Sequence, residues 1–439
     1  MSSFMECLVY TTGIAPRLTY TMEVLLGQLL GLNFRFTGNS DEFRSFQGSG
    51  LNYSSQRLSA REIFIPSSGF LFENTIRPVD LKVEKMDEIP RFFILDTPGA
   101  DIDFDLPAMI FFLLSRYEEY LPFNADVHGR FTAGESLASR NGFLHLPLVN
   151  IWAKYLRELF MLKFPGLELQ APEYYFQPTY DVDMAWAFQH KGWRSVGGWA
   201  KDALGFKTQM LDSRLKVWLG REEDPFFTFE RLKVLHKHYN LTPLWFFLMG
   251  EHGPFDKSIS WKNHIFQELI RNIGPRETIG IHPSYASNDD YKKMEAEILR
   301  LAIIKKSAVE NSRQHYLKLS FPTTYRSLIQ AGVKADYTMG FAEDIGFRAG
   351  MASPFFWYDL ERETATSLLI YPFQVMDVTL KNYMKLTPDQ AVDEVYSLVQ
   401  QVRKYGGTFT TLWHNSSFSA IHGWKGWEDA YRKIVKICL

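Results

Sequence analysis

The sequence predicts an α/β protein in which a smaller mixed α/β domain, residues 1–170, precedes a seven-stranded (β/α) barrel, residues 171–439. The length of 439 residues suits two or three domains, each with its own hydrophobic core. In the second half, short apolar or aromatic runs alternate with helical patterns, which indicates a parallel sheet. Seven such runs indicate a closed or nearly closed barrel. A polar, proline-containing stretch at residues 166–172 marks the expected boundary.

The first domain is expected to contain three helices. One, Pro16–Leu32, opens with proline, and the next, Pro107–Tyr120, has proline in its first turn, with Asp103 and Asp105 placed to favour its N-terminus. The third, Val149–Phe164, stops at the Pro-Gly pair that follows it. Strands are expected at Met5–Thr11, Ile63–Phe72 and Arg91–Leu95.

The barrel is expected to alternate strands with helices. Its strands are predicted at Tyr174–Tyr180, Leu244–Met249, Thr278–Ile281, Glu310–Gln314, Val333–Tyr337, Ser367–Pro372 and Thr408–Trp413. Helices are predicted at Trp261–Ile273, Asp290–Ala308, Pro322–Ala331 and Pro388–Tyr405. Gly406 and Gly407 form an expected C-cap and turn before the last strand. Residues 187–240 are too many for one connection, so we expect extra helices there, such as Thr208–Leu219, over one end of the barrel.

Composition excludes several classes of partner. The chain has 48 basic and 50 acidic side chains and a formal net charge of -2, so its total charge does not attract nucleic acid or an anionic membrane. We therefore expect a neutral or weakly charged partner. The two cysteines, Cys7 and Cys438, lie near opposite ends and cannot build a disulfide framework or a cysteine zinc module. A metal site would have to use histidine and carboxylate.

The first residues predict neither a signal peptide nor a membrane span. Acidic Glu6 comes early, with no basic leader before an apolar core. The longest apolar run nearby, at residues 22–34, contains Gln28 and is shorter than the about 20 residues that cross a bilayer. We expect a cytoplasmic protein, and the sequence predicts no oligomeric state.

Polar residues gather at the predicted strand ends, where the catalytic groups of a parallel barrel lie. They are Asp181, Asp183, His282, Arg313, His315, Asp336 and His414. Taken singly, each has a commoner explanation, as a helix N-cap, a hydrogen-bonded structural histidine or a surface ion pair. Their joint placement on one rim favours a site. The Asp-x-Asp spacing brings two carboxylates together, and their repulsion calls for a cation or a proton.

These residues resemble the motifs of the polysaccharide deacetylase family, metal-dependent N-deacetylases that share a distorted seven-stranded (β/α) barrel. The resemblance covers residues 174–439. The segment Thr179-Tyr180-Asp181-Val182-Asp183 is similar to the family's Thr-aromatic-Asp-Asp motif with one residue inserted. The resemblance implies that Asp181 is the general base and Asp183 a metal ligand, although the two roles could be exchanged.

The second motif, His-Ser/Thr-x-x-His, is matched in part. Its first histidine corresponds to His282, and Ala286 stands where the second, also a metal ligand, belongs. The segment Arg313-Gln314-His315 is similar to the family's Arg-x-Pro motif, so His315 is the first candidate for the missing ligand and His252 a weaker one. The arginine of that motif implies that Arg313 orients Asp181.

The remaining motifs lie near the last strands. Asp336-Tyr337 is loosely similar to the fourth motif, and Leu412-Trp413-His414 matches the fifth, Leu-x-His, which implies His414 as general acid and Trp413 in an acyl pocket. A carboxylate, Asp336 or Asp377, is expected to raise the pKa of His414. Besides Trp413, the expected substrate-binding residues are Tyr285 and Asn415.

The resemblance implies a hydrolase that removes an N-acetyl group from a carbohydrate with the help of a divalent metal, for which we expect zinc. The partner would be an N-acetylated sugar or oligosaccharide. A subgroup of the family found in bacteria also has a domain before the barrel, and the resemblance implies no role for it. Three alternatives stay open: a hydrolase of another amide or ester in a small metabolite, a non-catalytic carbohydrate-binding protein, and a scaffold whose residues 1–170 bind a partner.

Overall fold

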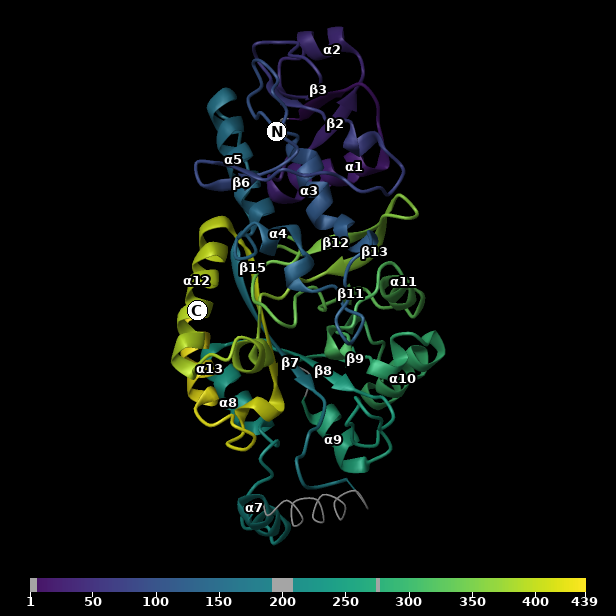
Figure 1. The fold of residues 1–439 in the computed structure, drawn as a ribbon, viewed down its shortest axis with the longest axis vertical. Coiled ribbons are helices and arrows are strands. Elements are labelled where there is room, and N and C mark those ends of the chain that lie inside the picture. Colours follow the sequence, from purple (N-terminus) through teal and green to yellow (C-terminus); the bar gives the residue numbers. More distant parts are fainter. Residues whose placement is uncertain (1–5, 192–207, 274–276) are drawn as a thin grey trace.

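The computed structural model describes residues 6–191, 208–273 and 277–439, and its strands form two main sheets (Figure 1). The smaller sheet has four parallel strands in the order β2-β1-β3-β4. Its strands are β1 (Cys7–Thr11), β2 (Phe34–Thr37), β3 (Ser49–Ser54) and β4 (Ile63–Pro66). Around it lie α1 (Pro16–Met22), which continues into η1 (Glu23–Leu29), and α2 (Ser40–Ser45), α3 (Leu106–Leu114) and α5 (Leu148–Lys163).

One helix and two strands expected in this half are corrected. The helix expected over Pro107–Tyr120 ends at Leu114, and Tyr117–Tyr120 is a separate 3-10 helix. The strand expected over Ile63–Phe72 ends at Pro66, and Phe70–Phe72 is a short 3-10 helix, η2. The strand expected at Arg91–Leu95 is not formed as one strand. Arg91 ends a hairpin of β5 (Glu84–Met86) and β6 (Ile89–Arg91), and Ile94 forms a single antiparallel bridge with Phe104. The strands β2 and β3 were not predicted, and β3 contains glycine and polar residues that weaken its pattern although all of it is buried.

The larger sheet has nine strands in the order β12-β13-β11-β10-β9-β8-β7-β15-β14. All neighbouring pairs are parallel except β12 and β13, which form an antiparallel pair at one edge. The strands are β7 (Tyr174–Val182), β8 (Leu244–Leu248), β9 (Thr278–His282), β10 (Asn311–Ser312), β11 (Ala335–Asp336), β12 (Phe355–Asp359), β13 (Thr364–Ile370), β14 (Val375–Met376) and β15 (Gly407–His414).

The expected closed barrel of seven strands is not what forms. All seven predicted strands are present, but β12 and β14 are additional, and the two ends of the sheet are not paired with each other in the described residues. Yet β13, which pairs with β11, and β14, which pairs with β15, are close in the chain. Only five Cα–Cα steps separate the end of β13 from the start of β14, and these span at most about 18 Å. The sheet therefore curls until its two ends are close, without closing its ladder of hydrogen bonds.

Helices cover the outside of this curled sheet (Figure 1). They are α8 (Phe229–Tyr239), α9 (His264–Asn272), α10 (Tyr291–Lys305), α11 (Thr323–Gln330), α12 (Pro388–Tyr405) and α13 (Trp427–Cys438), whereas α7 (Thr208–Trp218) lies apart at the bottom of Figure 1. The helix α12 begins with a capping box between Thr387 and Gln390 and ends at Gly406, whose φ of 78° suits glycine. Near the carboxyl end of β7, Val217 of α7 packs with Phe188 and Phe226.

The two sheets share one continuous hydrophobic cluster. Hydrogen bonds also join the N-terminal part to the larger sheet: Tyr20 Oη donates to Phe356 O (2.8 Å), and Asn150 Nδ2 donates to Gly406 O (3.0 Å). Arg17 of α1 is fully buried and forms an ion pair with Glu363, which lies between β12 and β13. Among the described residues, we find no helix whose length and apolar character would let it cross a bilayer.

Candidate metal centre and active site

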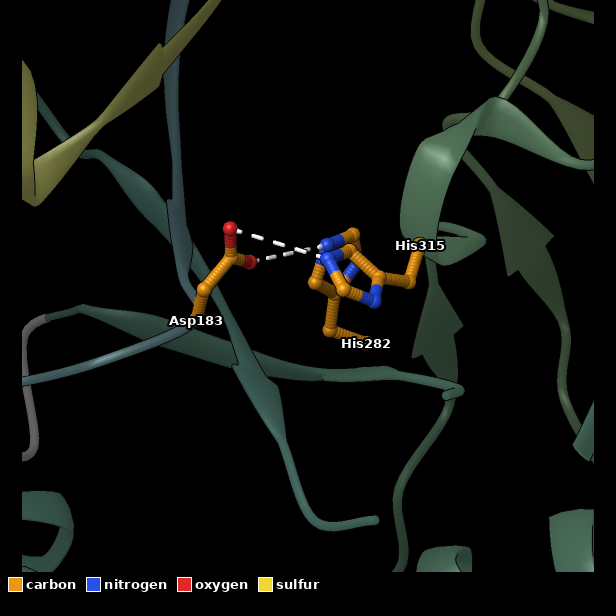
Figure 2. A group of neighbouring side chains, drawn as sticks. All are labelled: Asp183, His282 and His315. Atoms are coloured by element: carbon orange, nitrogen blue, oxygen red, sulfur yellow. Dashed lines mark ion pairs between the residues drawn. The ribbon is translucent and has the colours of Figure 1, made fainter. Parts of the chain in front are cut away.

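Three side chains that could bind a metal converge where the strands of the larger sheet end. Asp183 directly follows β7, His282 is the last residue of β9, and His315 lies in the turn after β10. Figure 2 shows the carboxylate of Asp183 facing both imidazole rings. His282 Nε2 lies 3.4 Å from Asp183 Oδ1, and His315 Nε2 lies 3.6 Å from Asp183 Oδ2. In a tetrahedral zinc site with bonds of about 2.0–2.1 Å, neighbouring ligand atoms are about 3.3 Å apart, so this spacing fits.

The surroundings of these three residues also fit a divalent metal. The Oδ1 atom of Asp183 is buried and has no hydrogen-bond partner among the described residues, although an unpaired buried carboxylate oxygen is costly. His282 donates through Nδ1 to Arg313 O (2.5 Å), and His315 donates through Nδ1 to Asp256 Oδ1 (2.8 Å). Each histidine is thereby oriented with Nε2 toward Asp183, the arrangement of metal-binding histidines.

The carboxylate of Asp256 organises this part of the site. It comes from the loop after β8 and also accepts backbone N–H bonds from Tyr285 (2.7 Å) and Ala286 (3.2 Å). Ala286, which stands where the resembling family has its second histidine, thus helps to hold the carboxylate that orients His315. The second nitrogen of the group is that of His315, which follows the next strand, β10. His252, the weaker candidate, is exposed and does not belong to the converging group.

Asp181 lies beside this group on β7. Arg313, fully buried, donates through Nη1 to Asp181 Oδ1 (2.9 Å) and through Nε to Tyr337 O (2.9 Å). The other carboxylate oxygen of Asp181, Oδ2, lies 3.6 Å from His282 Nε2. The ion pair of Asp181 with Arg313 is therefore formed, and one carboxylate oxygen faces the possible metal ligands.

His414 ends β15 and has a carboxylate partner. Asp377 accepts from its Nδ1 (2.8 Å) and from its backbone N–H (2.8 Å). Of the two carboxylates considered for this role, Asp336 instead accepts from Ser312 and Thr338. Burial alone would lower the pKa of His414, but the charge and hydrogen bond of Asp377 raise it to about 10. His414 is therefore protonated at neutral pH, with Nε2 4.0 Å from Asp183 Oδ2.

Asp183 and His315 have shifted pKa values in the metal-free protein. Burial alone would raise the pKa of Asp183, but the charge of His315 and the closeness of both imidazole rings lower it well below its usual value. Burial alone would lower the pKa of His315, but the nearby charges of Asp183 and Asp256 raise it to about 9. A metal that binds here would have to displace a proton from His315.

These side chains open into one pocket of about 310 Å³, the lower end of the range for small-molecule sites. Its polar lining includes Asp181, Asp183, His282, His315 and His414. One side is apolar, where Leu412, Met376 and Ala342 belong to a small buried cluster. At the rim lie two aromatic rings, Phe255 and Tyr316, which are 40% and 36% exposed.

None of the three predicted substrate-binding residues lines this pocket. Trp413 is fully buried and packs on Tyr431, with ring centroids 4.8 Å apart. Successive residues of a strand face opposite sides, so Trp413 faces away from the pocket that Leu412 and His414 line. Asn415 is buried, and its Nδ2 donates to Met184 O (2.9 Å) and Phe226 O (2.8 Å).

Tyr285, the third predicted substrate-binding residue, lies outside the pocket lining, next to the rim. Its ring packs on Phe255, with centroids 4.3 Å apart. The pocket is lined by five residues that were not predicted from the sequence: Phe255, Tyr316, Lys257, Tyr383 and Arg130. Asp256 was missed as well. In the loop after β8, the sequence analysis considered only His252, four residues before Asp256.

Comparison with known families found one match, in the N-terminal part of the chain. Residues 7–165 match the model of a family described as being of unknown function, DUF7033. A search of curated proteins gave no match.

Among solved structures, three similar ones cover about 60% of this chain. A putative polysaccharide deacetylase from Mycobacterium smegmatis is 16% identical, with a TM-score of 0.40 over 61% of this chain and 85% of that one. The polysaccharide deacetylase Bc1974 from Bacillus cereus is 13% identical, with a TM-score of 0.29 over 60% and 87%. A 4-alpha-glucanotransferase from Thermococcus litoralis is 13% identical, with a TM-score of 0.35 over 61% and 37%. These likenesses are too distant to assign an activity to the chain.

Proposed function

We propose that this protein is a metal-dependent hydrolase that removes an N-acetyl group from a carbohydrate. One observation carries the proposal: Asp181 and His414 border the same three possible metal ligands in one pocket. The carboxylate of Asp181 is paired with a buried arginine, and the imidazole of His414 is paired with a carboxylate. This set of groups is what metal-assisted amide hydrolysis needs. The motif resemblance of residues 174–439 supports the acetamide and the sugar as substrate.

The chain's own residues would divide the chemistry between them. Asp183, His282 and His315 would hold a divalent metal, which we propose to be zinc and which would lower the pKa of a bound water and polarise the acyl carbonyl. Asp181, held in place by Arg313, accepts the proton of the attacking water. His414, protonated through Asp377, donates a proton to the departing amine. The products are acetate and an amino sugar.

The lining of the pocket supports an N-acetylated sugar as substrate. The apolar side formed by Leu412, Met376 and Ala342 suits the methyl group of an acetyl, which gains by leaving water. The exposed rings of Phe255 and Tyr316 offer faces on which a sugar ring can pack. As part of the proposal we keep a cytoplasmic location, which favours a soluble N-acetylated sugar or oligosaccharide over an intact cell-wall polymer.

Metal content and acetate release together test the proposal. The wild-type protein should retain a divalent metal in elemental analysis, and His282→Ala should lose it. With zinc added, wild type should release acetate from chitooligosaccharides faster than from unrelated N-acetyl amides or simple acetate esters. Faster turnover of the other amides or esters would favour a small-metabolite hydrolase. A wild-type protein that binds no metal and releases no acetate would contradict the proposal and favour a binding protein.

A further inference from the structure

The N-terminal part of the chain reaches into the pocket through Arg130. This residue lies within the region that matches the family of unknown function, and it is only 8% exposed. Its Nε donates to Asp126 Oδ2 (2.8 Å), and its Nη1 donates to the backbone carbonyl of Tyr316 (2.6 Å). A longer contact joins Nη2 to Tyr383 Oη (3.4 Å). The guanidinium therefore connects the N-terminal part to the chain just after the possible metal ligand His315.

Arg130 is itself held in a fixed turn. Gly129 N donates to Asp126 O (2.9 Å), and the φ of 77° at Gly129 is one that glycine adopts without strain. The Oδ1 atom of Asp126 accepts from the backbone N–H groups of His128 (2.8 Å) and Arg130 (2.9 Å). One carboxylate thus holds both the turn and the guanidinium, which limits the positions that the Arg130 side chain can take.

The segment that Arg130 contacts has an unfavourable backbone. Tyr316 and Leu317 both have positive φ, 60° and 52°, a conformation that side chains with a Cβ rarely adopt. Such residues persist where their surroundings hold them. Inside the turn, Leu317 N donates to Gln314 O (3.0 Å). From the N-terminal part, Arg130 binds the carbonyl of Tyr316, and the ring of His128 packs on the ring of Tyr316 with centroids 4.9 Å apart.

We propose that Arg130 is a positioning residue for the metal centre, so that the N-terminal part completes the site of the larger sheet. By binding Tyr316 O, Arg130 holds the peptide between Tyr316 and Leu317, one residue beyond His315, while Asp256 holds the imidazole ring. Together the two contacts keep Nε2 of His315 facing Asp183. This inference rests on the proposed metal-dependent function, and it gives residues 1–170 a role that the sequence did not suggest.

The test measures zinc affinity, by competition with a chromophoric chelator, in wild type and four variants. Arg130→Met removes all the guanidinium contacts, and Arg130→Lys keeps one charged donor that can still reach a carbonyl. Tyr20→Phe is the matched control, because it removes another hydrogen bond from the N-terminal part to a backbone carbonyl, that of Phe356, and Tyr20 does not line the pocket. Asp126→Asn keeps Arg130 but removes its charged partner, and it serves as the test if Arg130→Met does not fold.

We expect Arg130→Met to weaken zinc binding at least about tenfold, the usual effect of removing a group that orients a metal ligand. Arg130→Lys should recover part of that loss, Asp126→Asn should show an intermediate loss, and Tyr20→Phe should bind as wild type does. With cobalt in place of zinc, the visible absorption of Arg130→Met should change in shape, which reports altered ligand geometry rather than lower occupancy alone.

The other outcomes separate the two proposals. Equal zinc affinity in wild type and Arg130→Met would overturn the positioning role and leave the proposed function standing. A similar loss in Tyr20→Phe would also overturn it, because the effect would then come from any weakening between the two parts. A wild-type protein that binds no zinc would overturn the proposed function, and the inference with it.

Discussion

His315 Nδ1 and Asp256 Oδ1 lie 2.8 Å apart, and this contact links loops that follow two different strands, β10 and β8. Because the carboxylate orients the ring and increases the basicity of its other nitrogen, Asp256→Asn should weaken zinc binding about 10–100-fold. Isothermal titration of the metal-free protein measures this. Asp41→Asn, at an exposed position of α2, is the control and should leave the affinity unchanged. Equal affinities in Asp256→Asn and wild type would show that His315 needs no such partner.

Asp181→Asn should abolish turnover while zinc stays bound. The substitution removes the proton acceptor but keeps the shape of the side chain and a possible contact with Arg313. Acetate release and elemental analysis on the same preparation check both parts. Asp183→Asn, as comparison, should lose the metal. If Asp181→Asn lost the metal together with activity, the ligand and base roles of the two aspartates would be exchanged.

His414→Ala should slow the hydrolysis of acetamides far more than that of activated acetate esters. An amine must be protonated as it leaves, whereas the leaving group of an activated ester needs no proton, and a lost general acid typically costs about 10²–10⁴-fold in rate. The ratio of the two rates, in wild type and variant, is the measurement. Equal losses on both substrates would mean that His414 binds the metal or shapes the pocket.

Asp377→Asn should lower the pKa of His414 from about 10 toward its usual value, because it removes the neighbouring charge that favours the imidazolium. The raised pKa implies that the charged form of His414 stabilises the metal-free fold. This contribution is fully present when the pH is below the pKa of histidine in the unfolded chain, about 6.5, and is lost as the pH rises through about 10. Titration of the metal-free protein by nuclear magnetic resonance follows the His414 signal directly. A signal that titrates at the same pH in both proteins would contradict this.

Zinc affinity should rise with pH between pH 6 and 8. In the metal-free protein the pKa of His315 is raised to about 9, so a proton occupies the ring over this whole range and must leave when the metal binds. One displaced proton corresponds to about a tenfold gain in apparent affinity for each pH unit. Titrations at several pH values measure the slope. His315→Gln should bind zinc weakly and with a smaller slope, and a flat profile in wild type would mean that His315 is no ligand.

Local signals predicted some elements of the fold closely. The bounds of α12 were predicted from a proline at its start and glycines at its end, because capping and termination depend on residues within one turn of the helix. The strands that lead into the site were found for a similar reason, since buried apolar runs between turn residues are visible in the sequence. The two-residue strand β14 was not predicted, and it forms by pairing with β15.

Side-chain orientation could be predicted only in part. Asp181, His282 and His414 were placed at the rim because each lies at the end of a strand. For Trp413 the same reasoning failed. A strand with apolar residues on both faces shows no alternation, so its sequence does not reveal that Leu412 faces the pocket and Trp413 faces away.

The sequence by itself determined which chemical groups end the strands of the parallel sheet, and so the kind of chemistry to expect. Only the tertiary structure decided that the sheet stays open, that Asp256 orients His315, that Asp377 rather than Asp336 partners His414, and that Arg130 reaches the pocket. Arg130 and Tyr316 are 186 residues apart in the chain. Contacts of this kind depend on how the N-terminal part packs against the rest of the chain, and no local pattern of residues encodes them.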